Sequence, residues 1–201
     1  LTKNNQYLIE GQTFVRTGKV LTIQPGTIIK GDKATKGTLV IDKGGKIEAN
    51  GTVTEPIVMT SNLPAGSRDR GDWGGLVILG QATNNQPGGV ANIEGIVPTA
   101  NTQYGGTNDN DNSGILKYVR VEYAGYEIFP GNELNGITFG GVGYGTEVDY
   151  VQVHNNQDDC VEFFGGTVNV SNVLIGHQGD DAIDIDMNYS GTVTNFVVIN
   201  G

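Results

Sequence analysis

Acidic residues gather in two short segments near the C-terminal end of this 201-residue chain. These segments contain Asp158, Asp159, Glu162, Asp180, Asp181, Asp184 and Asp186. Carboxylates placed close together either hold protons with raised pKa values or share a cation. The first arrangement supplies the acid and base of glycoside hydrolysis, and the second supplies the hard oxygen ligands of Ca²⁺. A structural alternative is that Asp side chains at turns accept hydrogen bonds from backbone N–H groups.

An internal repeat of 22 residues aligns the two acidic segments. The pattern Val-x-x-Val-x-Val that starts at Val148 returns as Val-x-x-Val-x-Ile from Val170, and Asp158-Asp159 returns as Asp180-Asp181. A period in the low twenties, with short β-branched segments, is typical of one coil of a β-solenoid. Residues one period apart then lie on adjacent strands, about 4.8 Å apart. Glu162 is therefore predicted to lie beside Asp184.

Strand alternation predicts which of these side chains face outward. Val161 and Phe163 are expected to point into the coil, and Glu162 and Phe164 to point away from it. By the same alternation Asp184 and Asp186 face outward on the next strand. Glu162, Asp184 and Asp186 are therefore the candidate acid, base or nucleophile if the protein is an enzyme. The corner residues are candidate calcium ligands or Asx-turn residues: Asp158, Asp159, Asp180 and Asp181.

Two other elements bear on metal binding. Asp109-x-Asp111-x-Ser-Gly resembles the opening of a calcium loop, but Arg120 stands where an EF-hand needs a bidentate Glu. Asp109 and Asp111 are thus candidate ligands of a calcium turn that is not an EF-hand, with an Asx-rich loop as the alternative. His154 and His177 do not share a repeat position, and neither gives strong support to a metal site or a catalytic nucleophile.

Aromatic residues near the acidic segments are candidate platforms for sugar rings. An insertion of eight residues within 124–134 precedes the acidic corner by one coil and is predicted to project beside it. Packing within the loop is the alternative interpretation. The candidate substrate-binding residues are Tyr126, Phe129, Phe164 and Tyr189.

The whole chain has the features of one all-β domain. Further strands are expected near 21–29, 39–41, 46–49, 57–59 and 76–79, each bounded by Gly, Pro, Asn or Asp. We predict a right-handed parallel β-helix of about eight or nine coils over residues 1–201. Its coils are less regular over 1–112 and regular over 113–201. Because no polar cap follows 196–199, we expect further chain after this segment or end-to-end self-association.

Charge and hydropathy restrict the partners. The formal net charge is −10, and clustered Lys and Arg, which nucleic-acid binding requires, are absent. No apolar stretch has the length of a membrane span, so an integral membrane protein is not expected. An anionic polymer is a poor partner unless calcium bridges it. The 32 glycines and the Asn, Thr and Ser content are typical of a turn-rich extracellular protein.

Several segments resemble a family of secreted bacterial surface proteins. They are Leu-x-Ile-x-Pro-Gly-Thr-x-Ile from Leu21, Gly-Asp-Trp-Gly-Gly from Gly71, Tyr-Gly-Gly-Thr from Tyr104, and the run from Asn156 to Asp184. The resemblance covers nearly the whole chain. It implies a right-handed, pectin-lyase-like β-helix that is secreted or at the cell surface. It implies no particular activity.

A narrower stretch is similar to polygalacturonase-type glycosidases of the same fold. Gln157-Asp158-Asp159-Cys160-Val161 resembles their paired-Asp motif. Asn135 stands where that family has a third catalytic Asp, and Asp180-Asp181 stands where it has Gly-His-Gly. The family's Arg-x-Lys strand has no counterpart in this sequence. These differences speak against that activity.

Three functions remain open at this point. The first is a secreted or cell-surface module that binds glycans or mediates adhesion and is stabilised by calcium. The second is a polysaccharide-degrading enzyme that uses the outward carboxylates of the acidic segments. The third is a structural unit that stacks on itself into a filament.

Overall fold

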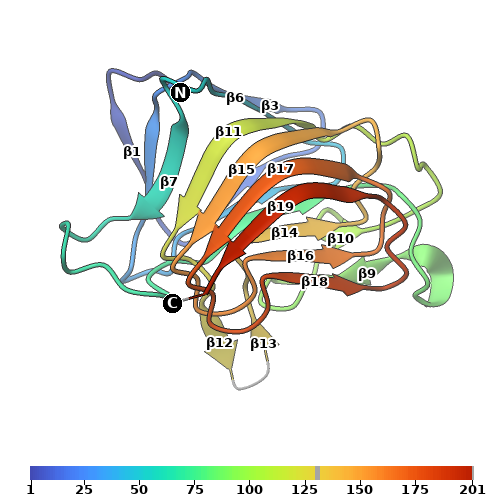
Figure 1. The fold of residues 1–201 in the computed structure, drawn as a ribbon. Helices are drawn as coiled ribbons and strands as arrows, with labels where there is room; N and C mark the ends of the chain where they lie inside the picture. The colour runs from blue at the N-terminus through green and yellow to red at the C-terminus, as the bar shows by residue number, and fades with distance from the viewer. Residues whose placement is uncertain (130–131, 201) are drawn as a thin grey trace.

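The structure is a computed structural model that describes residues 1–129 and 132–200, without the side chains of Phe129 and Asn132. Most of the strands form two parallel sheets (Figure 1). Sheet A contains β1 (Gln6–Ile9), β3 (Val20–Ile23), β4 (Ile28–Gly31), β6 (Lys46–Asn50), β7 (Ile57–Ser61), β11 (Gly114–Glu122), β15 (Glu147–His154), β17 (Asn169–Gly176) and β19 (Val193–Ile199). Sheet B contains β2 (Gln12–Val15), β5 (Thr38–Ile41), β8 (Gly75–Leu79), β14 (Ile137–Gly140), β16 (Val161–Phe164) and β18 (Ile183–Asp186).

Five short elements of the described chain lie outside these sheets. Two antiparallel pairs join β9 (Ala91–Asn92) to β10 (Gln103–Tyr104) and β12 (Glu127–Phe129) to β13 (Asn132–Glu133). One 3₁₀ turn, η1, spans Pro87–Gly89. In Figure 1 the β12–β13 hairpin projects from one end of the strands, on the same side as the chain's C-terminus.

The chain alternates between the sheets in its C-terminal half, from β14 to β15, β16, β17, β18 and β19. Every pair of neighbours within each sheet is parallel, and Val148 pairs with Val170 at the spacing of the repeat. A chain that returns to the same two sheets once per coil is a parallel β-helix. The predicted fold class is therefore confirmed.

The number of coils differs from the prediction. Sheet B has six strands, one per coil, among the described residues, whereas length divided by period predicted about eight or nine coils. The difference arises between β8 and β11, where residues 81–113 leave the coil and add no strand to either sheet. In the first half of the chain two short strands of sheet A, such as β6 and β7, together pair with the single long strand β11.

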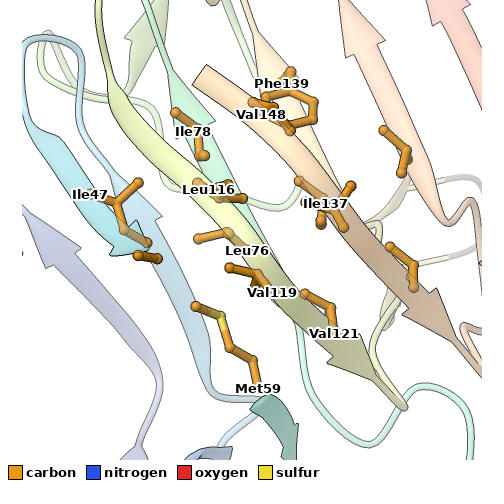
Figure 2. Close-up of a cluster of buried hydrophobic side chains, with 14 of the residues drawn as sticks. Ile47, Met59, Leu76, Ile78, Leu116, Val119, Val121, Ile137, Phe139 and Val148 are labelled. Carbon is orange, nitrogen blue, oxygen red and sulfur yellow. The ribbon is translucent and has the colours of Figure 1, made fainter. Parts of the chain in front are cut away.

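Inward side chains form one continuous core between the sheets. Figure 2 shows Leu116, Val119 and Val121 of β11 beside Leu76 and Ile137 of sheet B, and all five side chains are buried. Each such side chain stabilises the fold by roughly 1.5–3 kcal/mol relative to an exposed one. The alternation of β-branched and polar residues thus places one face of each strand in the core.

A second apolar cluster covers the outer face of sheet B. Val77 and Leu79 of β8 and Phe164 of β16 pack there against Ile93, Ile96 and Tyr104 from residues 81–113, together with Leu134 and Val40. Phe164 faces outward, as strand alternation predicts, but it is only 8% exposed. The 81–113 segment thus encloses an outer face that strand alternation alone would leave open to solvent.

Candidate functional site

The strands β16 and β18 bring the two acidic segments together. They pair in parallel with Glu162 opposite Asp184 and Phe164 opposite Asp186. This register is the one that the 22-residue repeat predicts. Oxygen atoms of Asp159, Glu162 and Asp184 all lie within 4.8 Å of one another. Side chains far apart in the sequence therefore form one compact group.

A second group overlaps the first at the corner that precedes these strands. Oxygen atoms of Asp158, Asp159 and Asp180 also lie within 4.8 Å of one another. We call the combined set the acidic cluster: Asp158, Asp159, Glu162, Asp180 and Asp184.

The corner itself is fixed by hydrogen bonds to the backbone. The Nδ2 amide of Asn156 donates to the carbonyl oxygen of Asp159 at 2.6 Å and to that of Asp158 at 3.1 Å. The Asp181 N–H donates to Asp159 Oδ1 at 2.8 Å. One oxygen of Asp159 thus serves the turn, as in an Asx corner. The structural and the ligand interpretations of this residue are therefore compatible.

Burial changes the acidity of the cluster. Glu162 is 7% exposed and Asp159 is 8% exposed. Burial, followed by the negative charges of Asp159 and Asp184, raises the pKa of Glu162 to about 9. Burial is also the main reason that the pKa of Asp159 rises to about 7 and that of Asp158 to about 6. At neutral pH the cluster therefore holds protons unless a cation replaces them.

Asn135, just before β14, contacts the group through its side-chain amide. Its Nδ2 amide donates to Glu162 Oε2. Its side chain is 1% exposed, and its Oδ1 has no hydrogen-bond partner among the described residues. A buried carbonyl oxygen without a partner costs about 1–3 kcal/mol. Such an oxygen beside carboxylates is a ligand that Ca²⁺ accepts.

The elements that cover sheet B bring two more carboxylates. Glu94 comes from the 81–113 segment and Glu133 from the β12–β13 hairpin. Burial, and then the charge of Glu133, raises the pKa of Glu94. The charge of Glu133 also contributes to the raised pKa of Asp158, after burial. The inserted hairpin therefore lies beside the acidic cluster, as the sequence predicts.

The remaining acidic candidates lie at the edge of the cluster. Asp186 is exposed, pairs in register with Phe164 and belongs to neither group of converging oxygens in the described chain. Asp181 is exposed and contributes its backbone N–H to Asp159. The structure thus brings Glu162 and Asp184 together and leaves Asp186 outside the pair.

Asp109 and Asp111 lie elsewhere and hold the ends of the 81–113 segment. Asp109 Oδ1 accepts hydrogen bonds from the backbone N–H and the hydroxyl of Thr83, at 2.9 and 2.7 Å. Asp111 is 4% exposed and accepts from Gln81 at 3.2 Å and Ser113 at 3.1 Å. Neither residue belongs to a metal-suitable group within residues 1–129 and 132–200.

The predicted sugar platforms are engaged with other parts of the protein. The Lys36 ammonium lies 4.0 Å from the centre of the Tyr126 ring, and Phe164 packs near Tyr104 at 6.1 Å between ring centres. Tyr189 stacks on Phe163 at 4.3 Å, and its hydroxyl donates to the Val168 carbonyl at 2.7 Å. The side chain of the fourth candidate, Phe129, lies outside the described residues.

An exposed aromatic pair that we did not predict lies on sheet A. The rings of Tyr118 and Tyr150 stack with centres 4.6 Å apart, and Tyr150 is 45% exposed. A signal was present in the sequence, because these residues occupy the same place in Leu-x-Tyr-Val and Val-x-Tyr-Val of aligned coils. The two tyrosines occupy one of the unspecified positions in the Val-x-x-Val pattern of the repeat.

Comparison with known proteins gives one match. A family model described as a pectate-lyase-like β-helix domain matches residues 1–201. No curated protein and no solved structure matches the chain. None of the described helical residues forms a helix long and apolar enough to cross a membrane.

Proposed function

The chain belongs to the pectate-lyase-like β-helix family, and on that basis we propose that it is a secreted or cell-surface glycan-binding module with Ca²⁺ in the acidic cluster. Membership suggests a carbohydrate-related role, and pectate-lyase-like domains are typically extracellular. What we propose beyond this is that the protein is secreted, adheres to glycans and binds calcium.

The observation that supports calcium most strongly is the spacing of three carboxylates. Ca²⁺ binds oxygen at roughly 2.3–2.6 Å, so two of its ligands lie at most about 5.2 Å apart. Oxygens of Asp159, Glu162 and Asp184 fall within 4.8 Å of one another, which lets one ion contact all three. Asn135 borders them through its Nδ2 amide, which donates to Glu162.

The charge of the protein explains why a cation would matter for glycan binding. With a net charge of −10, the protein repels acidic polysaccharides. A bound Ca²⁺ neutralises part of the cluster and offers open coordination positions to sugar hydroxyl or carboxylate oxygens. The exposed side chains of Asp180 and Asp186 place the rim of this face within reach of a polymer.

Calorimetry tests this proposal directly. Ca²⁺ is titrated into the wild-type protein, and a panel of neutral and acidic oligosaccharides is then titrated with Ca²⁺ or with EDTA. We expect Ca²⁺ binding that Glu162→Gln and Asp184→Asn weaken, with Asp186→Asn as the exposed matched control that leaves it unchanged. The proposal is rejected if wild-type protein binds no Ca²⁺, or if no oligosaccharide binds in either condition.

The second candidate is a glycosidase, and the raised pKa of Glu162 is the observation that favours it. A carboxyl group with a pKa of about 9 keeps its proton at neutral pH, as a general acid must. Asp184, its neighbour in register, would be the second carboxylate. Release of reducing ends from a polysaccharide, lost in both Glu162→Gln and Asp184→Asn, would support the enzyme. Release that survives in both variants would exclude this assignment.

A further inference from the structure

The two histidines of this chain lie against each other. His154 ends β15, and His177 directly follows β17 on the next coil. Their ring centres are 5.3 Å apart, with the ring planes at 77°. The two histidines do not align in the repeat because they are 23 residues apart rather than 22. The strand register aligns His154 with Gly176, and a left-handed backbone at His177 (φ 58°) begins the turn that follows.

We propose that His154 and His177 bind one divalent transition-metal ion through a nitrogen of each imidazole, with water in the remaining positions. The site lies on sheet A, on different strands from the acidic cluster. It is independent of the calcium proposal, because it uses other residues and another class of metal. Sequence position alone does not indicate this pair, because the two histidines do not share a repeat position.

The separation of the rings matches what one ion requires. With metal–nitrogen bonds of roughly 2.0–2.1 Å and a nitrogen about 1.2 Å from its ring centre, each centre lies about 3.2 Å from the ion. At a tetrahedral angle of about 109° the two centres are then about 5.2 Å apart. The observed separation is 5.3 Å. The proposal requires that the rings turn about their Cβ–Cγ bonds so that one nitrogen of each faces the shared ion.

The surroundings leave room for the ion and its waters. A hollow of about 130 Å³ is lined by both histidines, Gln152, Gly176 and Ile199. A water molecule takes about 30 Å³, so the hollow has space for an ion with a few waters. Gly176 keeps the site open, since a Cβ atom there would lie 3.2 Å from Nδ1 of His154. Both rings are partly exposed, and this leaves the hollow accessible from solvent.

The charged groups nearest the pair balance one another. Glu122 lies one coil from His154 in direct register, and Arg120 and Arg68 pair with its carboxylate. Burial, and then the neighbouring His177, lowers the pKa of His154. The lowered pKa favours the neutral imidazole, which is the form that binds metal. The protonation state of His154 therefore agrees with the geometry.

The ligands also determine which metals are expected. Imidazole nitrogen suits Cu²⁺, Ni²⁺ and Zn²⁺, and the usual order of affinity places Cu²⁺ first. Ca²⁺ prefers oxygen ligands and is not expected here. Excess Ca²⁺ in the buffer can therefore occupy the acidic cluster without blocking the histidine pair.

The test is a titration of the full chain with CuCl₂, NiCl₂ and ZnCl₂ in excess Ca²⁺, with electron paramagnetic resonance of the Cu²⁺ complex. We expect one site, tightest for Cu²⁺, with two nitrogen ligands in the spectrum. His154→Gln and His177→Gln should each weaken binding by about tenfold or more. Gly176→Ala, which crowds His154 without removing a ligand, should weaken it less, and Glu162→Gln should leave it unchanged.

Circular dichroism of each variant separates loss of the site from loss of the fold. A folded His154→Gln or His177→Gln protein that binds Cu²⁺ as tightly as wild type would overturn the proposal. A spectrum with fewer than two nitrogen ligands would overturn it as well. Loss of Cu²⁺ binding in Glu162→Gln would instead place the metal in the acidic cluster and would equally reject the histidine site.

Discussion

The pKa of Glu162 depends on the neighbouring coil and on the segment that covers sheet B. Its strand position directs it outward, where a Glu would ordinarily be hydrated and ionised. Residues 81–113 cover this face of sheet B, and Asp184 lies beside Glu162 in register. Burial and like charge together raise its pKa to about 9. Without metal this side chain keeps its proton at neutral pH, and our calcium proposal assigns it the role of a ligand once a cation replaces that proton.

The pH dependence of stability follows from this shift. A carboxyl whose pKa is raised on folding is protonated in both states at low pH, so it costs nothing there. As pH rises from about 4.5 to about 9 only the unfolded state ionises Glu162, so the free energy of unfolding falls across this range. Thermal denaturation in EDTA between these values of pH should show this decline.

Glu162→Gln should flatten that decline and raise the free energy of unfolding at pH 8 by on the order of 1 kcal/mol or more. Ca²⁺ should also raise the melting temperature at this pH in wild type, but less so in the variant. A wild-type melting temperature that rises steadily with pH in EDTA would contradict the assigned pKa shift.

Asn135 gives a second prediction at this scale. Replacing it with Ala removes the amide that donates to Glu162 and also the oxygen without a partner. We expect the unfolding free energy to change by less than about 2 kcal/mol, because the acceptor left without a donor on Glu162 and the unpartnered oxygen removed from Asn135 have opposite effects of about 1–3 kcal/mol each. If the oxygen is a calcium ligand, the variant should also bind Ca²⁺ more weakly in calorimetry. Thr38→Val, at another buried polar position of sheet B on β5, is the matched control. Unchanged Ca²⁺ affinity in Asn135→Ala would remove this residue from the site.

At the scale of elements, the strands were predictable and their outer cover was not. The repeat of Val148-x-x-Val151 at Val170-x-x-Val173 found β15 and β17, because an inward face must repeat wherever the core continues. The 81–113 segment has no repeat and no long periodic run, since it packs on only one coil face. The burial of Phe164 and Glu162 was therefore hidden from the sequence. The contact between the two histidines depends on a turn that does not follow the repeat, so it could not be predicted from the sequence either.

A row of aligned residues on sheet A has a strained backbone, and its effect on stability can be tested. Four aligned residues have left-handed backbones: Tyr118 (φ 49°), Tyr150 (φ 51°), Asn172 (φ 54°) and Asn195 (φ 53°). Asn tolerates this conformation, whereas it costs a bulky residue roughly 1–2 kcal/mol. The stacked rings return about 0.5–1.5 kcal/mol. The backbone strain and the stacking energy nearly cancel, so the two tyrosines change the stability of the fold little at these positions.

Tyr150→Asn should therefore change the free energy of unfolding by less than about 1 kcal/mol. Tyr150→Ala keeps the strain and loses the stacking, so it should be less stable than the Asn variant by about 1 kcal/mol. Chemical denaturation of the three proteins measures both differences. An Ala variant as stable as the Asn variant would show that the backbone conformation carries no such cost.

For the molecule as a whole, stability comes from a column of side chains that runs through the coils. Phe163 stacks on Phe139 at 5.3 Å and on Tyr189 at 4.3 Å. Each coil therefore packs on the next, in the interior as well as along the strands. The parallel fold was predictable because this stacking requires a fixed period. The number of coils was not predictable, because residues 81–113 leave the coil and division of the length by the period counts them as coils.

Phe163→Ala should interrupt this column and lower the free energy of unfolding by about 3–5 kcal/mol. Phe163→Leu keeps most of the volume and should cost less. The two variants can be compared by urea denaturation followed by circular dichroism. A loss below about 1 kcal/mol for the Ala variant would mean that the coils do not depend on this contact.

The most direct test of the calcium proposal is diffraction from crystals grown or soaked in Ca²⁺, with anomalous data to identify the ion. The account predicts one cation in contact with Asp159, Glu162 and Asp184, with oxygen distances of roughly 2.3–2.6 Å. Crystals at saturating Ca²⁺ that show only water among these three carboxylates would contradict it.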